Sequence, residues 1–139
     1  MRAFVTLRHF PAVALLAAAI ALAAWLSIAP HSASATQLNA PVVGIAGTPD
    51  GGGYWLVGAD GGIFTEGDAH FYGSVANVHL NAPVVGIAAT PDGKGYWMAA
   101  ADGGVFNEGD ANFYGSLGNT HLNQPVSGIA RTPDGRGLS

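Results

Sequence analysis

Carboxylates are the residues of this chain best suited to catalysis or metal binding, and they recur at a spacing of 42 residues. Each of the nine acids has a counterpart at that spacing: Asp50, Asp92 and Asp134; Asp60 and Asp102; Glu66 and Glu108; Asp68 and Asp110. A catalytic pair usually occurs once in a chain, whereas acids that cap turns recur with the fold. The pattern favours turn carboxylates bound to their own backbone, and it predicts a protein that is not an enzyme.

Calcium binding is the alternative use of these acids. Asp60, Glu66 and Asp68 lie within nine residues of one another and could supply oxygen ligands at one rim. The equivalent ligands in the second copy would be Asp102, Glu108 and Asp110. Their spacing matches neither an EF-hand loop nor the Gly-Gly-x-Gly-x-Asp calcium repeat. We therefore expect no cofactor, and we keep the six acids as a secondary metal hypothesis.

Aromatic residues are the remaining candidates for ligand binding. The candidates are two adjacent pairs, Tyr54 with Trp55 and Tyr96 with Trp97. Because adjacent residues of a strand point to opposite faces, one of each pair is expected in the core and its neighbour nearer solvent. An exposed ring could stack on a sugar or grip a peptide, and a repeated array would multiply weak contacts. The competing interpretation is that these rings only pack the core.

The charge and composition of the chain exclude several classes of partner. Residues 36–139 contain three basic and nine acidic residues, which gives a net charge of −6 with His neutral. An acidic body argues against nucleic acid and against an anionic membrane surface. The chain has no cysteine, so disulfides and thiolate metal sites are excluded.

The first 35 residues have the three-part pattern of a secretory signal peptide. Arg2 and Arg8 precede an apolar run over residues 11–29, and small residues follow at Ala33 and Ala35. This pattern predicts cleavage after Ala35 and a secreted or cell-envelope location. The alternative is an uncleaved anchor, because a run of this length could just span a bilayer. Residues 11–29 are then the only expected contact with a membrane.

A 42-residue repeat organises residues 36–139. Residues 38–79 and 80–121 are identical at 31 of 42 positions, and a third, partial unit covers 122–139. Turn residues divide each unit into four predicted strands: 42–47, 54–57, 63–65 and 70–72 in the first, and 84–89, 96–99, 105–107 and 112–114 in the second. Four strands in about 42 residues is typical of a propeller blade. The predicted fold is therefore all-β, an incomplete β-propeller-like repeat of two four-stranded blades plus the first strand of a third.

The repeat also resembles a known family. Its units read close to P-V-V-G-I-A-x-T-P-D-G-x-G-Y-W, then D-G-G-x-F and G-D-A-x-F-Y-G-S, over 41–74 and 83–116. This pattern is similar to the glycine-rich repeats of exported actinobacterial proteins. The resemblance implies a β-propeller-like module, often found beside other domains in cell-envelope proteins.

The first two units continue with Tyr-Trp after the glycine equivalent to Gly137, whereas the third unit has Leu138-Ser139 there and stops. Propellers usually need four to eight blades, so two blades leave open faces. Three explanations follow: a truncated remnant of a longer protein, a homo-oligomer that closes a ring, or a free-standing pair of sheets.

The function expected from these observations is an exported, non-catalytic binding or scaffold module, with a polysaccharide or a protein as its ligand. The alternatives are an accessory segment of an exported hydrolase whose catalytic domain lies outside this chain, and a remnant without function.

Overall fold

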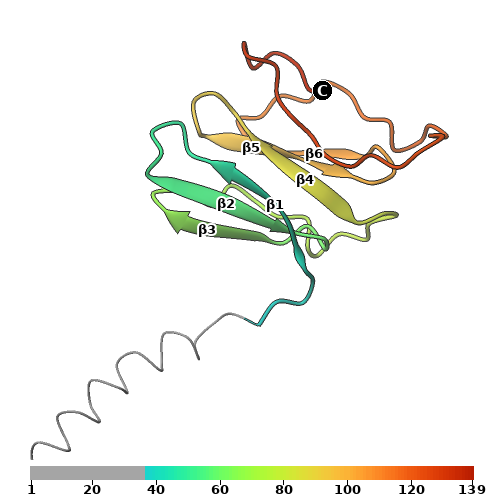
Figure 1. The fold of residues 1–139 in the computed structure, drawn as a ribbon, viewed down its shortest axis with the longest axis horizontal. Helices are drawn as coiled ribbons and strands as arrows, with labels where there is room; N and C mark the ends of the chain where they lie inside the picture. The colour runs from blue at the N-terminus through green and yellow to red at the C-terminus, as the bar shows by residue number, and fades with distance from the viewer. Residues whose placement is uncertain (1–36) are drawn as a thin grey trace, which may run out of the picture. The chain divides into compact units, whose positions relative to one another are not determined.

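Two antiparallel three-stranded sheets form the regular part of the structure. A computed structural model describes residues 37–139, of which Leu38–Ser139 form one unit. The first sheet contains β1 (Val42–Gly47), β2 (Gly53–Gly58) and β3 (Ile63–Gly67). The second sheet contains β4 (Val84–Ala89), β5 (Gly95–Ala100) and β6 (Val105–Gly109), again in chain order (Figure 1). The all-β prediction is confirmed for these residues.

The predicted signal peptide over 1–35, with its predicted cleavage site at Ala33 and Ala35, lies outside the described residues. Within 37–139 there is no helix long and apolar enough to cross a membrane.

The predicted turn between the first two strands of each unit is present. Thr48 N donates to Gly53 O at 2.9 Å, and Gly51 N donates to Thr48 O at 3.0 Å. Gly51 has a φ of 75°, which a residue with a Cβ seldom adopts. The same hydrogen bonds recur over residues 90–95 and 132–137, so the turn chemistry repeats in all three units.

The prediction of a fourth strand in each unit is wrong. Residues 70–72 and 112–114 form no strand, because a side chain binds the backbone that a ladder would use. Trp55 Nε1 donates to His70 O at 2.7 Å, and Trp97 Nε1 donates to Asn112 O at 2.6 Å. Each unit is therefore a three-stranded sheet followed by an irregular segment that an indole holds in place.

The first strand predicted for the third unit is also absent. Residues 126–131 make only an isolated bridge, Arg131 with Leu138. Ala130 and Ser139 exchange two backbone hydrogen bonds of 2.8 Å, in the positions that Ala88 and Trp97 occupy in the β4–β5 pair. The third unit therefore forms only the turn end of the hairpin that β4 and β5 form in the second unit.

The larger apolar core lies between the two sheets. Trp55 and Val57 of β2 face Tyr96 and Met98 of β5, and all four side chains are fully buried. A smaller cluster on the far face of the second sheet centres on Trp97, with Ile129 and Leu138 of the third unit packed against it. We call the face of each sheet that carries Trp55 or Trp97 its Trp face. Each Trp face packs against the unit that follows it in the chain.

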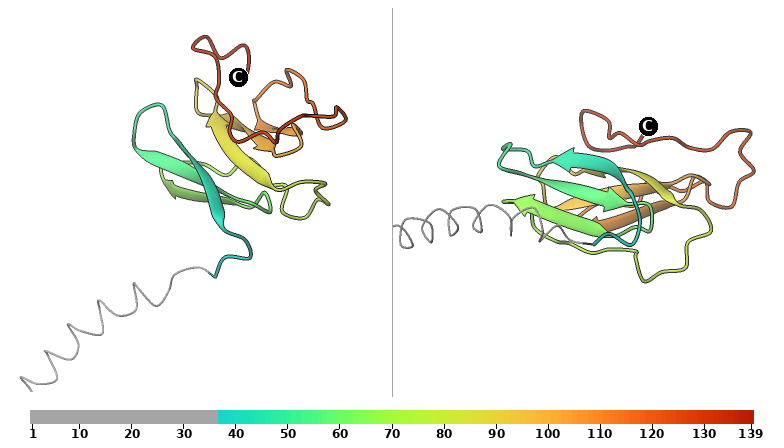
Figure 2. Two further views of the ribbon diagram at one scale, coloured as in Figure 1. Left: turned by 45° about the vertical axis from the view of Figure 1, so that its right-hand side comes forward. Right: turned by 60° about the horizontal axis from the view of Figure 1, so that its bottom comes forward.

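Glycines allow the first strands of the two sheets to approach closely. β1 lies beside β4 (Figures 1 and 2), and this pair makes the most extensive contact between the sheets. A Cβ added to Gly44 would lie 3.2 Å from Gly86 Cα, and one added to Gly86 would lie 3.5 Å from Gly128 Cα. We call Gly44, Gly86 and Gly128 the glycine column.

The glycine column gives a test of this packing. We expect Gly44→Val to destabilise the protein by about 1–3 kcal/mol, because the added methyl groups would force the two sheets apart. Gly128→Val is the matched control, since a Cβ at Gly128 meets nothing within 4 Å among the described residues. Urea unfolding of both variants at low protein concentration measures the difference. Equal free energies of unfolding would contradict the close approach of β1 and β4.

Candidate functional site

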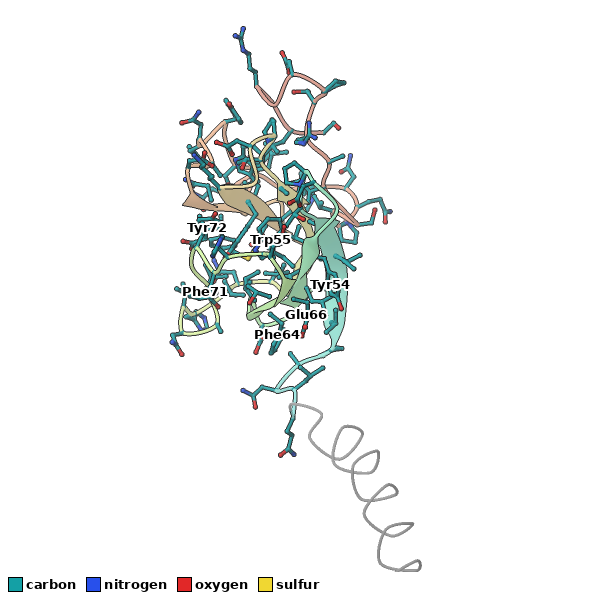
Figure 3. All side chains as sticks on the ribbon, turned by 90° about the vertical axis from the view of Figure 1, so that its left-hand side faces the viewer. Tyr54, Trp55, Phe64, Glu66, Phe71 and Tyr72 are labelled. Atoms are coloured by element: carbon teal, nitrogen blue, oxygen red, sulfur yellow. The ribbon has the colours of Figure 1, made fainter. Side chains whose placement is uncertain are left out.

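Three of the four aromatic residues proposed to bind ligand are core residues. Trp55 and Tyr96 are 0% exposed and Trp97 is 1% exposed, whereas Tyr54 is 39% exposed. Figure 3 shows Trp55 between the sheets and Tyr54 on the side of the first sheet away from the second. The core-packing interpretation therefore holds for Trp55, Tyr96 and Trp97, and only Tyr54 can meet a ligand.

Tyr96 joins the second sheet to the irregular segment of the first unit. Its hydroxyl donates to Gly73 O at 2.5 Å and accepts from Tyr72 N at 3.2 Å. Its ring lies 5.7 Å from that of Trp55 and 6.0 Å from that of Tyr72, measured between centroids. Burial raises the pKa of Tyr96 above its usual value, so the phenol stays protonated and keeps donating.

This network predicts unequal effects for two equivalent tyrosines. We expect Tyr96→Phe to cost about 1–3 kcal/mol, because it leaves the Gly73 carbonyl and the Tyr72 amide without their partner. Tyr54→Phe, at the equivalent position of the first unit, should change the free energy of unfolding by less than about 0.5 kcal/mol. Chemical denaturation measures both, and a costly Tyr54→Phe would contradict the assignment of Tyr54 to an open face.

The carboxylates of the metal hypothesis are not brought together. Asp60 precedes β3 and Asp68 follows it, so the two acids lie at opposite ends of the strand with Glu66 near the second end. Asp60 accepts from Gly62 N at 3.0 Å, and Asp102 accepts from Gly104 N at 2.9 Å. Among residues 37–139, no three His, Asp or Glu side chains lie close enough to hold a metal ion. The three acids of each unit therefore cannot bind one ion at one rim, because β3 or β6 lies between the first acid and the other two.

Asp68 and Asp110 instead pair with the aspartates of the preceding turns. Thr48 Oγ1 lies 2.7 Å from Asp50 Oδ1 and 3.1 Å from Asp68 Oδ1. A hydrogen bond from Gly52 N lowers the pKa of Asp50 to about 2. In the second unit, a hydrogen bond shared between the two carboxyl groups lowers the pKa of Asp92 to about 2 and raises that of Asp110. These acids tie the end of β3 or β6 to a turn, which is a structural role.

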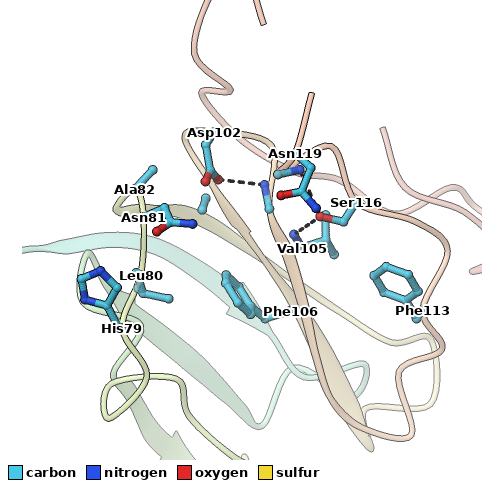
Figure 4. Close-up of a pocket in the computed structure, with 13 residues that line it drawn as sticks. His79, Leu80, Asn81, Ala82, Asp102, Val105, Phe106, Phe113, Ser116 and Asn119 are labelled. Carbon is cyan, nitrogen blue, oxygen red and sulfur yellow. Dashed lines mark hydrogen bonds between the residues drawn. The ribbon is translucent and has the colours of Figure 1, made fainter. Parts of the chain in front are cut away.

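A groove of about 440 Å³ is the best candidate for a binding site, and its volume suits a small ligand or one unit of a polymer. It lies where the chain passes from the first unit to the second. Figure 4 shows His79 and Asn81 of the connecting segment on one side and Phe113 and Asn119 on the other, with Phe106 of β6 between them. Phe113 is 59% exposed, so one ring face is open to a ligand.

The groove offers hydrogen bonds and aromatic surface but no activated nucleophile. The hydroxyl of Ser116 accepts from Val105 N at 3.2 Å and from Gly118 N at 3.3 Å, and it lies 3.4 Å from Gly103 O. Three backbone groups therefore occupy it. The groove also holds two asparagine amides, an imidazole and the Asp102 carboxylate, one oxygen of which accepts from Gly104 N, beside two phenyl rings. This set can bind a hydroxyl-rich ligand by hydrogen bonds and stacking.

Six residues that line the groove recur in the first unit, and of these only the aspartates were candidates from the sequence. Asn81, Asp102, Phe106, Phe113, Ser116 and Asn119 correspond to Asn39, Asp60, Phe64, Phe71, Ser74 and Asn77. Phe71 is 60% exposed, almost the same as Phe113. For Phe71 and Phe113, the signal that could have identified them is identity between the units at a position with no turn or core role. It was hidden because 31 of 42 positions are identical.

Comparisons with known proteins find similarity among solved structures only. No protein-family model matches the chain, and no curated protein matches it. Among solved structures, the chain is similar to hydrazine synthase of Kuenenia stuttgartiensis, with 18% sequence identity and a TM-score of 0.46. The match covers 74% of this chain and 30% of the synthase chain, so this chain spans less than a third of that structure.

Proposed function

We propose that this protein is an exported, non-catalytic module that binds polysaccharide through grooves repeated once per 42-residue unit. The observation that carries the proposal is the groove at Phe113, because its exposed ring, its two asparagines and its aspartate recur in the first unit, where Gln37 stands in place of His79. A repeated site suits a polymer with a repeated unit, since neighbouring weak contacts add up to a higher avidity. Neutral sugars fit the site better than anionic ones, because residues 36–139 carry a net charge of −6.

We also propose that each sheet is a blade of a propeller-like array. Two observations support this geometry. Equivalent strands, β1 and β4, lie beside each other, and the Trp face of one sheet packs on the next sheet. Glycines on the first strands bring those strands together, as blades require near a common axis. An array of this kind would act as a scaffold that holds the grooves at fixed intervals.

The binding proposal predicts that the two exposed phenylalanines contribute together. Retention on insoluble cell-wall polysaccharide freed of protein should be saturable for the wild type. Phe113→Ala and Phe71→Ala should each weaken binding by about three- to tenfold through the loss of one stacked ring. The double variant should lose saturable retention, because no ring is left for avidity to act on. Sedimentation of the protein with the polysaccharide measures all three.

Val78→Ala is the matched control, because Val78 is 52% exposed and apolar but does not line the groove. Its retention should equal that of the wild type. Wild-type retention by the double variant would refute the groove as the site. Release of soluble sugar from the polysaccharide by the purified chain would refute the non-catalytic part of the proposal.

The export proposal rests on residues 1–35 and makes a separate prediction. When the full chain is expressed in a secreting bacterium, the protein in the medium or envelope fraction should begin at Thr36, because a signal peptidase cleaves after small residues such as Ala33 and Ala35. Mass spectrometry of the intact protein measures its N-terminus. An uncleaved chain in the membrane fraction would instead support an anchor over residues 11–29, and a chain confined to the cytoplasm would contradict export.

A further inference from the structure

One face of the first sheet is apolar and open. Ile45, Leu56 and Phe64 are direct partners across β1, β2 and β3, so they form one row on this face, and Tyr54 lies two residues before Leu56 on the same side. Ile45 is 63% exposed and Tyr54 is 39% exposed. We call these four residues the leading face (Figure 3 labels Tyr54 and Phe64). It has no cover among residues 37–139.

The chain itself shows what covers a face of this composition. In the second sheet the equivalent residues are Ile87, Met98, Phe106 and Tyr96. Ile87 is 6% exposed and Tyr96 and Met98 are fully buried, because the Trp face of the preceding sheet packs on them. A leading face is therefore the surface by which one unit of this repeat packs on the unit before it.

Three sets of contacts fix this packing, and each occurs again at the next step along the chain. In the glycine column, Gly44 meets Gly86, and Gly86 meets Gly128. At the turns, Gly93 packs on Pro49, and Gly135 packs on Pro91. Between backbones, Val84 N donates to Ala59 O at 2.9 Å, and Val126 N donates to Ala101 O at 2.9 Å. One geometry thus relates the first unit to the second and the second to the third.

Both ends of this series are open among the described residues. At one end, a Cβ added to Gly51, the equivalent of Gly93 and Gly135, meets nothing within 4 Å. At the other end, a Cβ added to Gly128 also meets nothing within 4 Å. A Cβ added to either of its equivalents, Gly44 or Gly86, would contact the glycine of the next unit. The two ends are complementary, because each presents the half of the contact that the other lacks.

From this complementarity we infer that a second copy of this chain docks head to tail on the leading face. The outer side of residues 126–137 of one copy packs against β1 and the 48–53 turn of the next copy. Gly128 then meets Gly44, and Pro133 meets Gly51. First strand against first strand is also the main contact within the chain, since β1 against β4 is the most extensive pairing between the sheets. An association of this type is heterologous, so it closes into a ring or extends as a filament.

Cysteine cross-linking tests the order of the two copies, because the natural chain has no cysteine. The protein used carries residues 37–139, which form a unit with its own core. Gly52→Cys and Pro133→Cys place single thiols at the two turns predicted to meet. A side chain is tolerated at the position of Gly52, because the equivalent residue of the second unit is Lys94. When the two variants are mixed with a short bifunctional maleimide, we expect a mixed dimer in excess of either homodimer. A double variant should give a ladder of higher masses or one closed ring.

Sedimentation of the unmodified protein gives the second readout. The weight-average mass should rise with concentration, and Ile45→Asp should raise the midpoint concentration about tenfold or more, because it removes the burial of one isoleucine side chain. Val78→Asp, an equally drastic change away from the leading face, should leave the midpoint unchanged. The inference would be overturned by cross-linked homodimers of Gly52→Cys alone. It would also be overturned if the two aspartate variants had equal effects, or if the protein sedimented as a monomer at every concentration. Polysaccharide binding enters neither readout, so the inference stands or falls apart from the proposed function.

Discussion

The close approach of β1 and β4 at Gly44 and Gly86 is the contact on which the rest of the structure depends. With an added Cβ only 3.2 Å from the facing Cα, no larger residue fits at Gly44 without movement of a strand. Because the backbones meet here, the Trp face of the first sheet reaches Tyr96 and Met98, and the main core closes. The same contact brings the connecting segment 79–82 beside the second sheet, where it forms one wall of the groove.

Hydrogen bonds from aromatic side chains decide where each sheet ends. The indoles of Trp55 and Trp97 and the phenol of Tyr96 bind backbone groups of residues 70–73 and 112. These bonds satisfy part-buried backbone groups that a fourth strand would otherwise pair. They also leave the segments free of a sheet, which lets Phe71 and Phe113 project toward solvent. The limit of each sheet and the exposure of the groove aromatics therefore have one cause.

The acids illustrate that a recurring position can be purely structural. Asp50 and Asp92 hold the turns through backbone amides and threonine hydroxyls. The bond from Gly52 N is the main cause of the low pKa of Asp50, and the bond with Asp110 is the main cause of the low pKa of Asp92. The phenylalanines of the groove recur just as faithfully, but no packing or turn requirement accounts for an exposed ring at both positions. Recurrence alone does not distinguish the two cases. Exposure and an adjacent groove are the observations that favour the proposed binding role of Phe113.

The sequence by itself determined the 42-residue unit, the first three strands of each full unit and the Thr-Pro-Asp-Gly turns, because these depend on local residue types and on φ values that only glycine adopts readily. It could not decide which aromatic residues are buried. Tyr54 and Tyr96 occupy the same position in nearly identical units, yet one is exposed and the other buried. The difference comes only from the neighbouring unit that packs on Tyr96. The absent fourth strand and the separation of Asp60 from Asp68 are likewise tertiary outcomes, because they depend on contacts between segments distant in the chain.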